Sequence, residues 1–146
     1  GGFHIPVALQ PHYNLMVRGF ETDGQRAVAE REGLGVFPYY SLAHGFLAGK
    51  YRDVADADAP GASPRAEESV AYLNDRGRAV LAALDEVAAA HGVDVATVAL
   101  AWLRQQPTVA APIASARNTA QLPALLASLD LELTQSEVDQ LSAASE

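Results

Sequence analysis

The sequence predicts an α/β protein with a parallel sheet, and three observations support this fold class. Apolar, strand-like runs occur at 5–10 (IPVALQ), 36–40 (VFPYY) and 109–113 (VAAPI). Segments with helical periodicity separate these runs, so we expect parallel pairing through right-handed crossovers. The runs are nearly continuous in apolar residues, which is typical of a sheet covered on both faces. Three strands are too few for a closed barrel or an ordinary doubly wound sheet.

A helix is expected between the first two strands, and a long loop after the second. The segment 23–35 alternates charged residues with alanine, valine and leucine. In it, Asp23 is a candidate N-cap and Gly33 a C-terminal stop. Residues 53–66 combine Asp, Ala, Pro and Gly without periodicity, which predicts a surface loop that is functional or mobile.

Two helices are expected before the third strand. Over residues 67–90 apolar side chains recur on one helical face. The pair His91 and Gly92 is typical of a helix C-terminus, so we interpret His91 as a cap. Asp94 is suited to capping the next helix, which Pro107 ends.

Two capping boxes predict the helices that follow the third strand. Asn118 and Gln121 have the spacing of a capping box for a helix that runs to Ser128. Thr134 and Glu137 repeat this spacing before a last helix. The predicted order is therefore strand, helix, strand, long loop, two helices, strand, helix, helix.

Composition excludes several classes of function. The chain has 146 residues, of which 49% are hydrophobic, which is enough for the core of one domain. Its 18 acidic residues outnumber its 10 basic ones, and this argues against nucleic acid, which is bound by clustered Lys and Arg. The chain has no cysteine, so we expect a cytoplasmic protein without disulfides. No apolar run approaches the roughly 20 residues of a membrane span.

The carboxyl ends of the three strands carry polar and aromatic side chains, and parallel folds collect their functional groups there. Gln10 ends the first strand, Tyr39 and Tyr40 end the second, and Ser115 and Arg117 follow the third. Together these groups suit a dinucleotide. The amide can pair with a carboxamide, a phenol ring can lie against a flat heterocycle, and the arginine can hold a phosphate.

Each of these side chains also has an ordinary structural interpretation. Gln10 and Asn14 can satisfy loop backbone. Tyr39 and Tyr40 are common strand residues. An isolated arginine such as Arg117 is more often a solvated surface residue. The convergence of three strand ends favours the cofactor interpretation.

Two other motifs do not support a site. The stretch GFLAGKY is similar to a phosphate-binding P-loop, but three residues separate Gly45 from Gly49 where four are required. Tyr51 stands where Ser or Thr is needed to bind magnesium. The four histidines have no i, i+4 spacing, so we expect no metal site.

The order of these stretches resembles the C-terminal part of the aldo-keto reductase family. LQPHYNL is similar to the family's strand-six segment and GVFPYYSLAHGFLAGKYR to its strand-seven segment. VATVALAWL is similar to the helix before strand eight, and PIASARNTAQL to the cofactor-phosphate segment after it. The resemblance implies that residues 1–146 form the C-terminal, three-strand portion of a TIM-type (β/α)8 barrel, which is incomplete in this chain.

The resemblance also implies a function and a set of binding residues. Family members bind NADPH and deliver its hydride to an aldehyde or ketone. Gln10 would hold the nicotinamide amide, Tyr39 would stack on the nicotinamide ring, and Arg117 would face the 2′-phosphate. The pyrophosphate side would be lined by Tyr40, Ser41, Leu42, Ala43, Gly45 and Leu47, and the adenosine end by Ser115, Arg117 and Gln121.

The chain departs from the family pattern in two respects. Leu125 stands where many relatives have an asparagine that contacts adenine. The family's catalytic Asp, Tyr, Lys and His come from the first half of the barrel, so we assign no catalytic residue here. No tyrosine matches the proton donor, and the sole lysine, Lys50, lies in the GKY segment.

Three interpretations of the whole chain remain. It can be the cofactor-binding part of an NADPH-dependent carbonyl reductase, a cofactor-binding module without chemistry, or a structural remnant that binds nothing. Three barrel strands alone expose two sheet edges and the side chains that fill the barrel interior. We therefore expect a piece of a longer reductase, or a chain that completes its sheet with the missing barrel half or with another chain.

Overall fold

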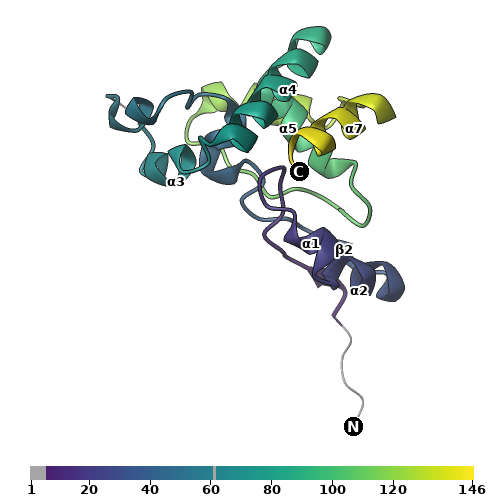
Figure 1. The fold of residues 1–146 in the computed structure, drawn as a ribbon. Helices are drawn as coiled ribbons and strands as arrows, with labels where there is room; N and C mark the ends of the chain where they lie inside the picture. Colours follow the sequence, from purple (N-terminus) through teal and green to yellow (C-terminus); the bar gives the residue numbers. More distant parts are fainter. Residues whose placement is uncertain (1–5, 61) are drawn as a thin grey trace.

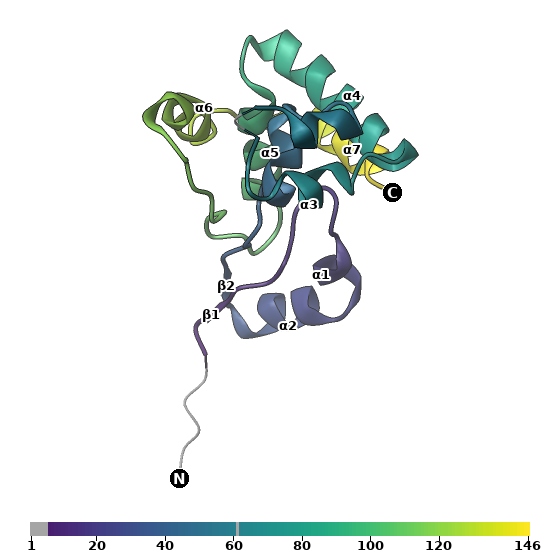
Figure 2. The ribbon, with the colours of Figure 1, turned by 90° about the vertical axis from the view of Figure 1, so that its left-hand side faces the viewer.

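The computed structural model describes residues 6–60 and 62–146, which form a mostly helical α/β structure (Figure 1). A body containing α3, α4, α5 and α7 lies above the segment of β1, β2, α1 and α2, which extends away from it. A view turned by 90° places α6 beside α5 (Figure 2). The elements are β1 (Ala8–Leu9), α1 (Gly19–Thr22), α2 (Gln25–Glu32), β2 (Gly35–Val36), η1 (Ala43–Ala48), η2 (Val54–Asp58), α3 (Ala66–Val70), α4 (Asp75–His91), α5 (Val95–Arg104), η3 (Thr119–Gln121), α6 (Leu122–Ala127) and α7 (Gln135–Ala144), where η denotes a 3₁₀ helix.

The three predicted strands run side by side in parallel, but they are much shorter than predicted. β1 and β2 pair over two residues each. Backbone hydrogen bonds from Phe37 to Leu9 and from Tyr39 to Pro11 keep the two segments together beyond this ladder. The predicted third strand contributes a single parallel bridge, between Val109 and Val36. The strand boundaries predicted at 5–10, 36–40 and 109–113 are therefore wrong, and residue 5 lies outside the described residues.

Proline and incomplete burial account for the short strands. Pro11, Pro38 and Pro112 have no N–H group and cannot donate to a ladder. The side chains of Val7 and Ile113 are 83% and 41% exposed, so the sheet is not covered on both faces as the apolar runs suggest. Strand pairing in this region lacks the side-chain burial that stabilises a longer sheet.

The single helix predicted over 67–90 is two helices, α3 and α4. The chain leaves the helical path after Val70, and Asn74 caps α4 by accepting a hydrogen bond from the Gly77 N–H at 2.9 Å. A Cβ atom on Gly77 would lie 1.8 Å from the Tyr72 carbonyl oxygen, so this close approach requires glycine. The predicted C-terminus is confirmed, because α4 ends at His91 with Gly92 in the left-handed conformation.

Two of the predicted N-caps differ from the structure in detail. Gly24 rather than Asp23 occupies the N-cap of α2, and the Asp23 carboxylate accepts the N–H of Gln25 at 2.9 Å. The stop at Gly33 is confirmed by its left-handed backbone. α5 begins after Asp94 as predicted, but the Asp94 side chain makes no cap hydrogen bond.

Of the two predicted capping boxes, one forms and one does not. Thr134 and Glu137 bond reciprocally at the start of α7, as the spacing predicts. Asn118 makes no side-chain cap hydrogen bond. Instead the Gln121 amide oxygen accepts the N–H of Arg117 at 2.8 Å, and the short helices η3 and α6 follow. The prediction at Asn118 is therefore wrong.

The predicted loop at 53–66 has local structure. Asp53 and Asp56 form a capping box that starts the 3₁₀ helix η2. The backbone N–H of Ser63 donates to the hydroxyl of Tyr51 at 3.1 Å, which ties the far end of the segment to the buried Tyr51 ring. Most of its side chains are exposed, as expected for a surface segment.

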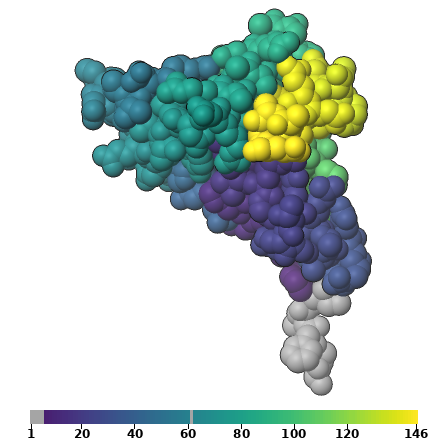
Figure 3. Space-filling model, viewed as in Figure 1, coloured from purple at the N-terminus to yellow at the C-terminus, as the bar shows by residue number. Residues whose placement is uncertain are grey.

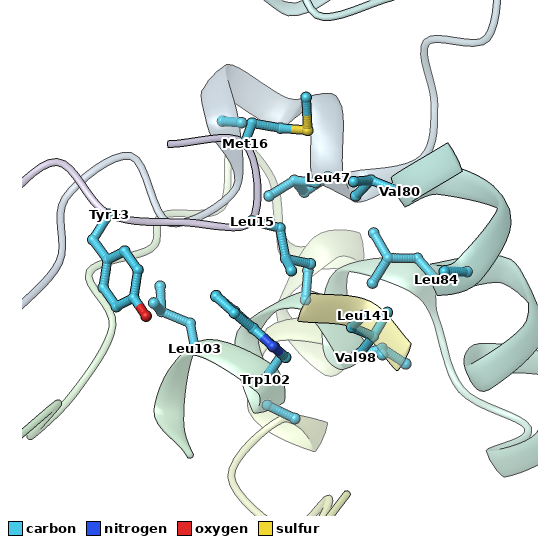
Figure 4. Close-up of a cluster of buried hydrophobic side chains, with 14 of the residues drawn as sticks. Tyr13, Leu15, Met16, Leu47, Val80, Leu84, Val98, Trp102, Leu103 and Leu141 are labelled. Carbon is cyan, nitrogen blue, oxygen red and sulfur yellow. The ribbon is translucent and has the colours of Figure 1, made fainter. Parts of the chain in front are cut away.

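The hydrophobic core lies between the helices rather than on the sheet. Figure 4 shows Leu84 of α4, Trp102 of α5 and Leu141 of α7 around Leu15, which comes from the segment after β1. These four side chains are all within the core of buried residues. The Trp102 indole N–H donates to Ser142 at 3.0 Å, so its polar atom is also satisfied. The apolar face predicted along α4 is confirmed.

Among the described residues, no single helix combines the length and apolar character needed to cross a membrane. α4 and α5 reach that length and composition only as a pair, and the pair is bent by 98°. α5 is largely buried within the protein, whereas α4 buries one face and exposes the other.

Candidate functional site

A cavity of about 780 Å³ opens where the three strand paths end. This volume lies within the usual range of ligand-binding pockets. Parallel pairing explains its location, because the carboxyl ends of parallel strands meet at one edge of a sheet. All the predicted binding residues except Ala43 and Leu47 line the cavity: Gln10, Tyr39, Tyr40, Ser41, Leu42, Gly45, Ser115, Arg117 and Gln121.

Ala43 and Leu47 do not line the cavity. Both side chains are fully buried in the hydrophobic core beneath η1. Their side chains anchor the loop that carries Ser41 and Gly45, and a contact of these two residues with a cofactor stays a prediction. Apolar residues in a loop can line a cavity or pack into the core. Tertiary contacts decide between these two positions, and the sequence pattern does not contain them.

The backbone around η1 is strained. Tyr40, Ala43 and His44 have φ values of 53°, 47° and 58°, in the left-handed region that non-glycine residues rarely adopt. Such residues persist where the surrounding structure holds them, and they cluster at functional sites. The strain therefore supports a functional role for this edge of the cavity.

Asn14 holds the strained Tyr40 in place. Its side chain is fully buried, and its amide NH₂ donates to the Tyr40 carbonyl oxygen at 2.9 Å. Its amide oxygen accepts from the N–H groups of Met16 at 2.8 Å and Val17 at 3.0 Å. The ordinary interpretation of Asn14, that it satisfies loop backbone, is therefore the one that the structure shows.

An aromatic cluster forms the wall of the cavity near Gln10. Tyr39 and Tyr40 are 37% and 38% exposed and meet edge to face, with ring centroids 5.2 Å apart. His12 stacks on Tyr39 at 5.1 Å, and His44 lies 4.1 Å from Tyr40. The guanidinium of Arg65 lies over the Tyr40 ring at 5.6 Å. The two tyrosines are thus partly exposed and line the cavity, so they are not buried in the core.

Arg117 is exposed and lines the same cavity. Within residues 6–60 and 62–146, no carboxylate lies close enough to form an ion pair with its guanidinium. Its backbone N–H donates to Gln121, which fixes the turn that presents the side chain. An unpaired guanidinium is well suited to bidentate recognition of a phosphate.

Two basic residues at the cavity were missed by the sequence analysis. Lys50 and Arg65 line it together with Arg117, whereas Asp94 is its one acidic lining residue within the described part of the chain. The chain as a whole carries a net charge of −8, so the excess of basic over acidic lining residues runs against the overall charge. No motif signals Arg65, because its position depends on how residues 53–66 fold back.

The aldo/keto reductase family model matches residues 2–146 of this chain. The chain belongs to the aldo/keto reductase family. This result confirms the resemblance found in the sequence, and its placement in the C-terminal part of the family is compatible with the match.

Comparisons with individual aldo/keto reductase relatives show how much of a whole protein the chain represents. "Protein tas" from Escherichia coli K12 is 32% identical over 143 residues, or 94% of this chain and 39% of the relative. Norsolorinic acid reductase B from Dothistroma septosporum is 30% identical over 139 residues, or 94% of this chain and 34% of the relative. A crystal structure of a thermostable aldo-keto reductase with the inhibitor epalrestat shares the fold, with a TM-score of 0.66 at 22% identity, over 92% of this chain and 38% of that one. The chain therefore spans less than half the length of these relatives.

Two tyrosines that could be proposed as the reductase proton donor do not reach the cavity. Tyr51 follows Lys50 and lies 5.0 Å from its ammonium, but its ring is buried and its hydroxyl accepts from Ser63. Tyr13 is buried and donates to Glu21 at 2.7 Å. Burial, followed by this hydrogen bond, raises the pKa of the Tyr13 phenol.

Part of the cavity lining is aliphatic. Leu125, which departs from the family's expected asparagine, lines the cavity together with Ala96, Ala120 and Ala124. The hydroxyl of Thr97 donates to the Ala124 carbonyl oxygen at 2.7 Å and so joins the start of α5 to α6. A base bound here would be held by contact with aliphatic side chains.

Replacing Asn14 tests its role in holding the cavity wall. Asn14→Ala removes three hydrogen bonds at a buried position, so we expect the free energy of unfolding to fall by about 2–4 kcal/mol. Asn118→Ala is the matched control. Because Asn118 makes no cap hydrogen bond, we expect a change within about 0.5 kcal/mol. Urea titration measures both values, and equal losses in the two variants would contradict the assignment.

Proposed function

We propose that this chain supplies the NADPH-binding part of an aldo/keto reductase that reduces aldehydes or ketones. The observation that carries the proposal is the cavity at the strand ends, where an amide, exposed tyrosine rings and unpaired basic groups face one space. Its volume of about 780 Å³ is large enough for much of a dinucleotide. When bound, NADPH would supply the hydride for reduction.

The residues at the two ends of the cavity fit the two ends of this cofactor. At one end, the Gln10 amide can pair with the carboxamide and the open face of Tyr39 can stack on the nicotinamide ring. At the other end, Arg117 can bind the 2′-phosphate. Lys50 and Arg65, which line the same cavity, add positive charge for the pyrophosphate.

Arg117 supports a preference for NADPH over NADH. NADH lacks the 2′-phosphate and therefore gains nothing from an arginine placed at that position. The guanidinium has no ion-pair partner within the described part of the chain, so it needs to break no contact before it binds an anion. The discrimination between the two cofactors should depend mainly on this side chain.

Replacing Arg117 tests the cofactor assignment. We expect Arg117→Ala to weaken NADPH binding by roughly 10- to 100-fold, the value of a charge-assisted hydrogen bond, and NADH binding by less than about threefold. Arg31→Ala is the matched control, since Arg31 is an exposed arginine of α2 paired with Glu32. Fluorescence titration gives the dissociation constants. An equal loss for the two cofactors would contradict the assignment.

A second candidate function is a cofactor-binding or assembly module without chemistry. It is favoured by the position of Tyr51, since the tyrosine next to the sole lysine lies outside the cavity. In this case the chain would bind NADPH and turn over no substrate by itself. Measuring NADPH oxidation by this chain with a panel of aldehydes tests the second function, because any turnover would exclude it.

We also propose that the sheet is completed by the remaining part of the barrel or by another chain. Val7 beside β1, Ile113, and Leu126 and Leu129 at the end of α6 expose large apolar side chains to solvent. The space-filling view shows the β1–α2 segment projecting from the body (Figure 3). Exposed apolar groups and an open strand edge favour association.

Sedimentation of the purified chain tests this proposal. We expect association that increases with protein concentration, because burial of the apolar side chains beside β1 and α6 stabilises the associated form. Substituting Leu126 and Leu129 together by glutamate should reduce the association. A monodisperse monomer with a cooperative urea transition would contradict it.

A further inference from the structure

His12 lies directly behind the tyrosine that faces the cavity. The two rings stack with centroids 5.1 Å apart and planes inclined by 26°, and a parallel backbone bridge between His12 and Tyr39 fixes their register. Tyr39 lines the cavity, whereas His12 does not. The imidazole therefore covers one face of the Tyr39 ring, while Tyr39 itself stays partly exposed to the cavity.

The surroundings of His12 favour the neutral imidazole. Its Nε2 atom is buried and has no hydrogen-bond partner among residues 6–60 and 62–146. Protonation would leave a charged N–H group there without an acceptor. Burial, followed by the neighbouring His44, lowers the pKa of His12. The other titratable or charged groups at this cluster are Tyr39, Tyr40 and Arg65, which lies over the Tyr40 ring.

The charge on His12 would act on one difference between the two redox forms of the cofactor. The nicotinamide ring of NADP⁺ carries a positive charge, and that of NADPH carries none. Both forms share the same phosphates. In the proposed complex the Tyr39 ring lies between His12 and the nicotinamide ring. A positive charge on His12 therefore repels the oxidised ring only.

Building on the proposed function, we propose that His12 sets the preference of the site between NADP⁺ and NADPH. The neutral imidazole accepts both forms, and the imidazolium disfavours NADP⁺. By linkage, bound NADP⁺ lowers the pKa of His12 further. The affinity for NADP⁺ is then highest above the pKa that His12 has in the free protein. It decreases as the pH falls through that pKa and His12 becomes protonated. Stacking alone would give no such dependence.

The test is the ratio of the two dissociation constants, NADP⁺ over NADPH, measured by fluorescence titration between about pH 8 and about pH 5.5. Titration of the 2′-phosphate affects both forms equally and cancels in the ratio. We expect the ratio to rise about threefold to tenfold towards low pH. His12→Phe keeps the stacked ring and removes the titratable group, so its ratio should stay constant. His12→Gln provides a second neutral variant.

Two further variants separate His12 from other histidines. His44→Asn removes the neighbouring imidazole that lowers the pKa of His12, so the rise in the ratio should move to higher pH. Asparagine tolerates the left-handed backbone at this position. His91→Gln is the matched control, because His91 contacts Glu137 at the end of α4, outside the cavity, and should leave the profile unchanged.

The outcomes distinguish this inference from the function on which it rests. If neither cofactor binds at any pH, both are overturned. If both bind and the ratio of the unmodified chain does not change with pH, the role of His12 is overturned and the cofactor site stands. A rise that persists in His12→Phe also overturns the role of His12.

Discussion

The shape of the candidate site depends on the buried amide of Asn14. It joins the segment after β1 to the carbonyl of Tyr40, which follows the parallel pairing of β1 and β2. The same amide closes the turn at Met16 and Val17, and the neighbouring Leu15 enters the helical core. The tyrosine wall is thereby fixed to the hydrophobic core of the protein. A sheet with ladders only two residues long could not by itself impose this geometry.

Local sequence predicts the order of elements well and their boundaries less well. Apolar runs identify the three parallel paths, but they cannot show that Val7 and Ile113 are left uncovered. Capping-box spacings likewise do not determine which hydrogen bonds form. The spacing at Thr134 and the spacing at Asn118 are identical, yet only the first forms, because the Gln121 amide bonds to Arg117 instead. The choice between two nearby N–H groups is made by the tertiary path of the chain.

The site was predictable to the extent that it lies at strand ends. Gln10, Tyr39 and Arg117 could be grouped because parallel strands bring their carboxyl ends to one edge. Arg65 could not, because it reaches the cavity through the segment 53–66. That segment folds back through a hydrogen bond to Tyr51 and the packing of α3 on η1, and no local pattern encodes either contact.

The two ends of the cavity are supported in different ways, and this has a consequence for binding. The tyrosine wall is tied to the core through Asn14, whereas Arg117 sits on an exposed, extended segment that is joined to the rest by backbone contacts such as Ile113 to Pro38. Ordering a loosely supported segment costs free energy that a preorganised wall does not. For the cofactor proposed above, the tyrosine wall is therefore preformed, and most of the ordering on binding falls on the segment that carries Arg117. Charge attraction by Arg117 can offset that cost, because a guanidinium forms strong, charge-assisted hydrogen bonds with a phosphate.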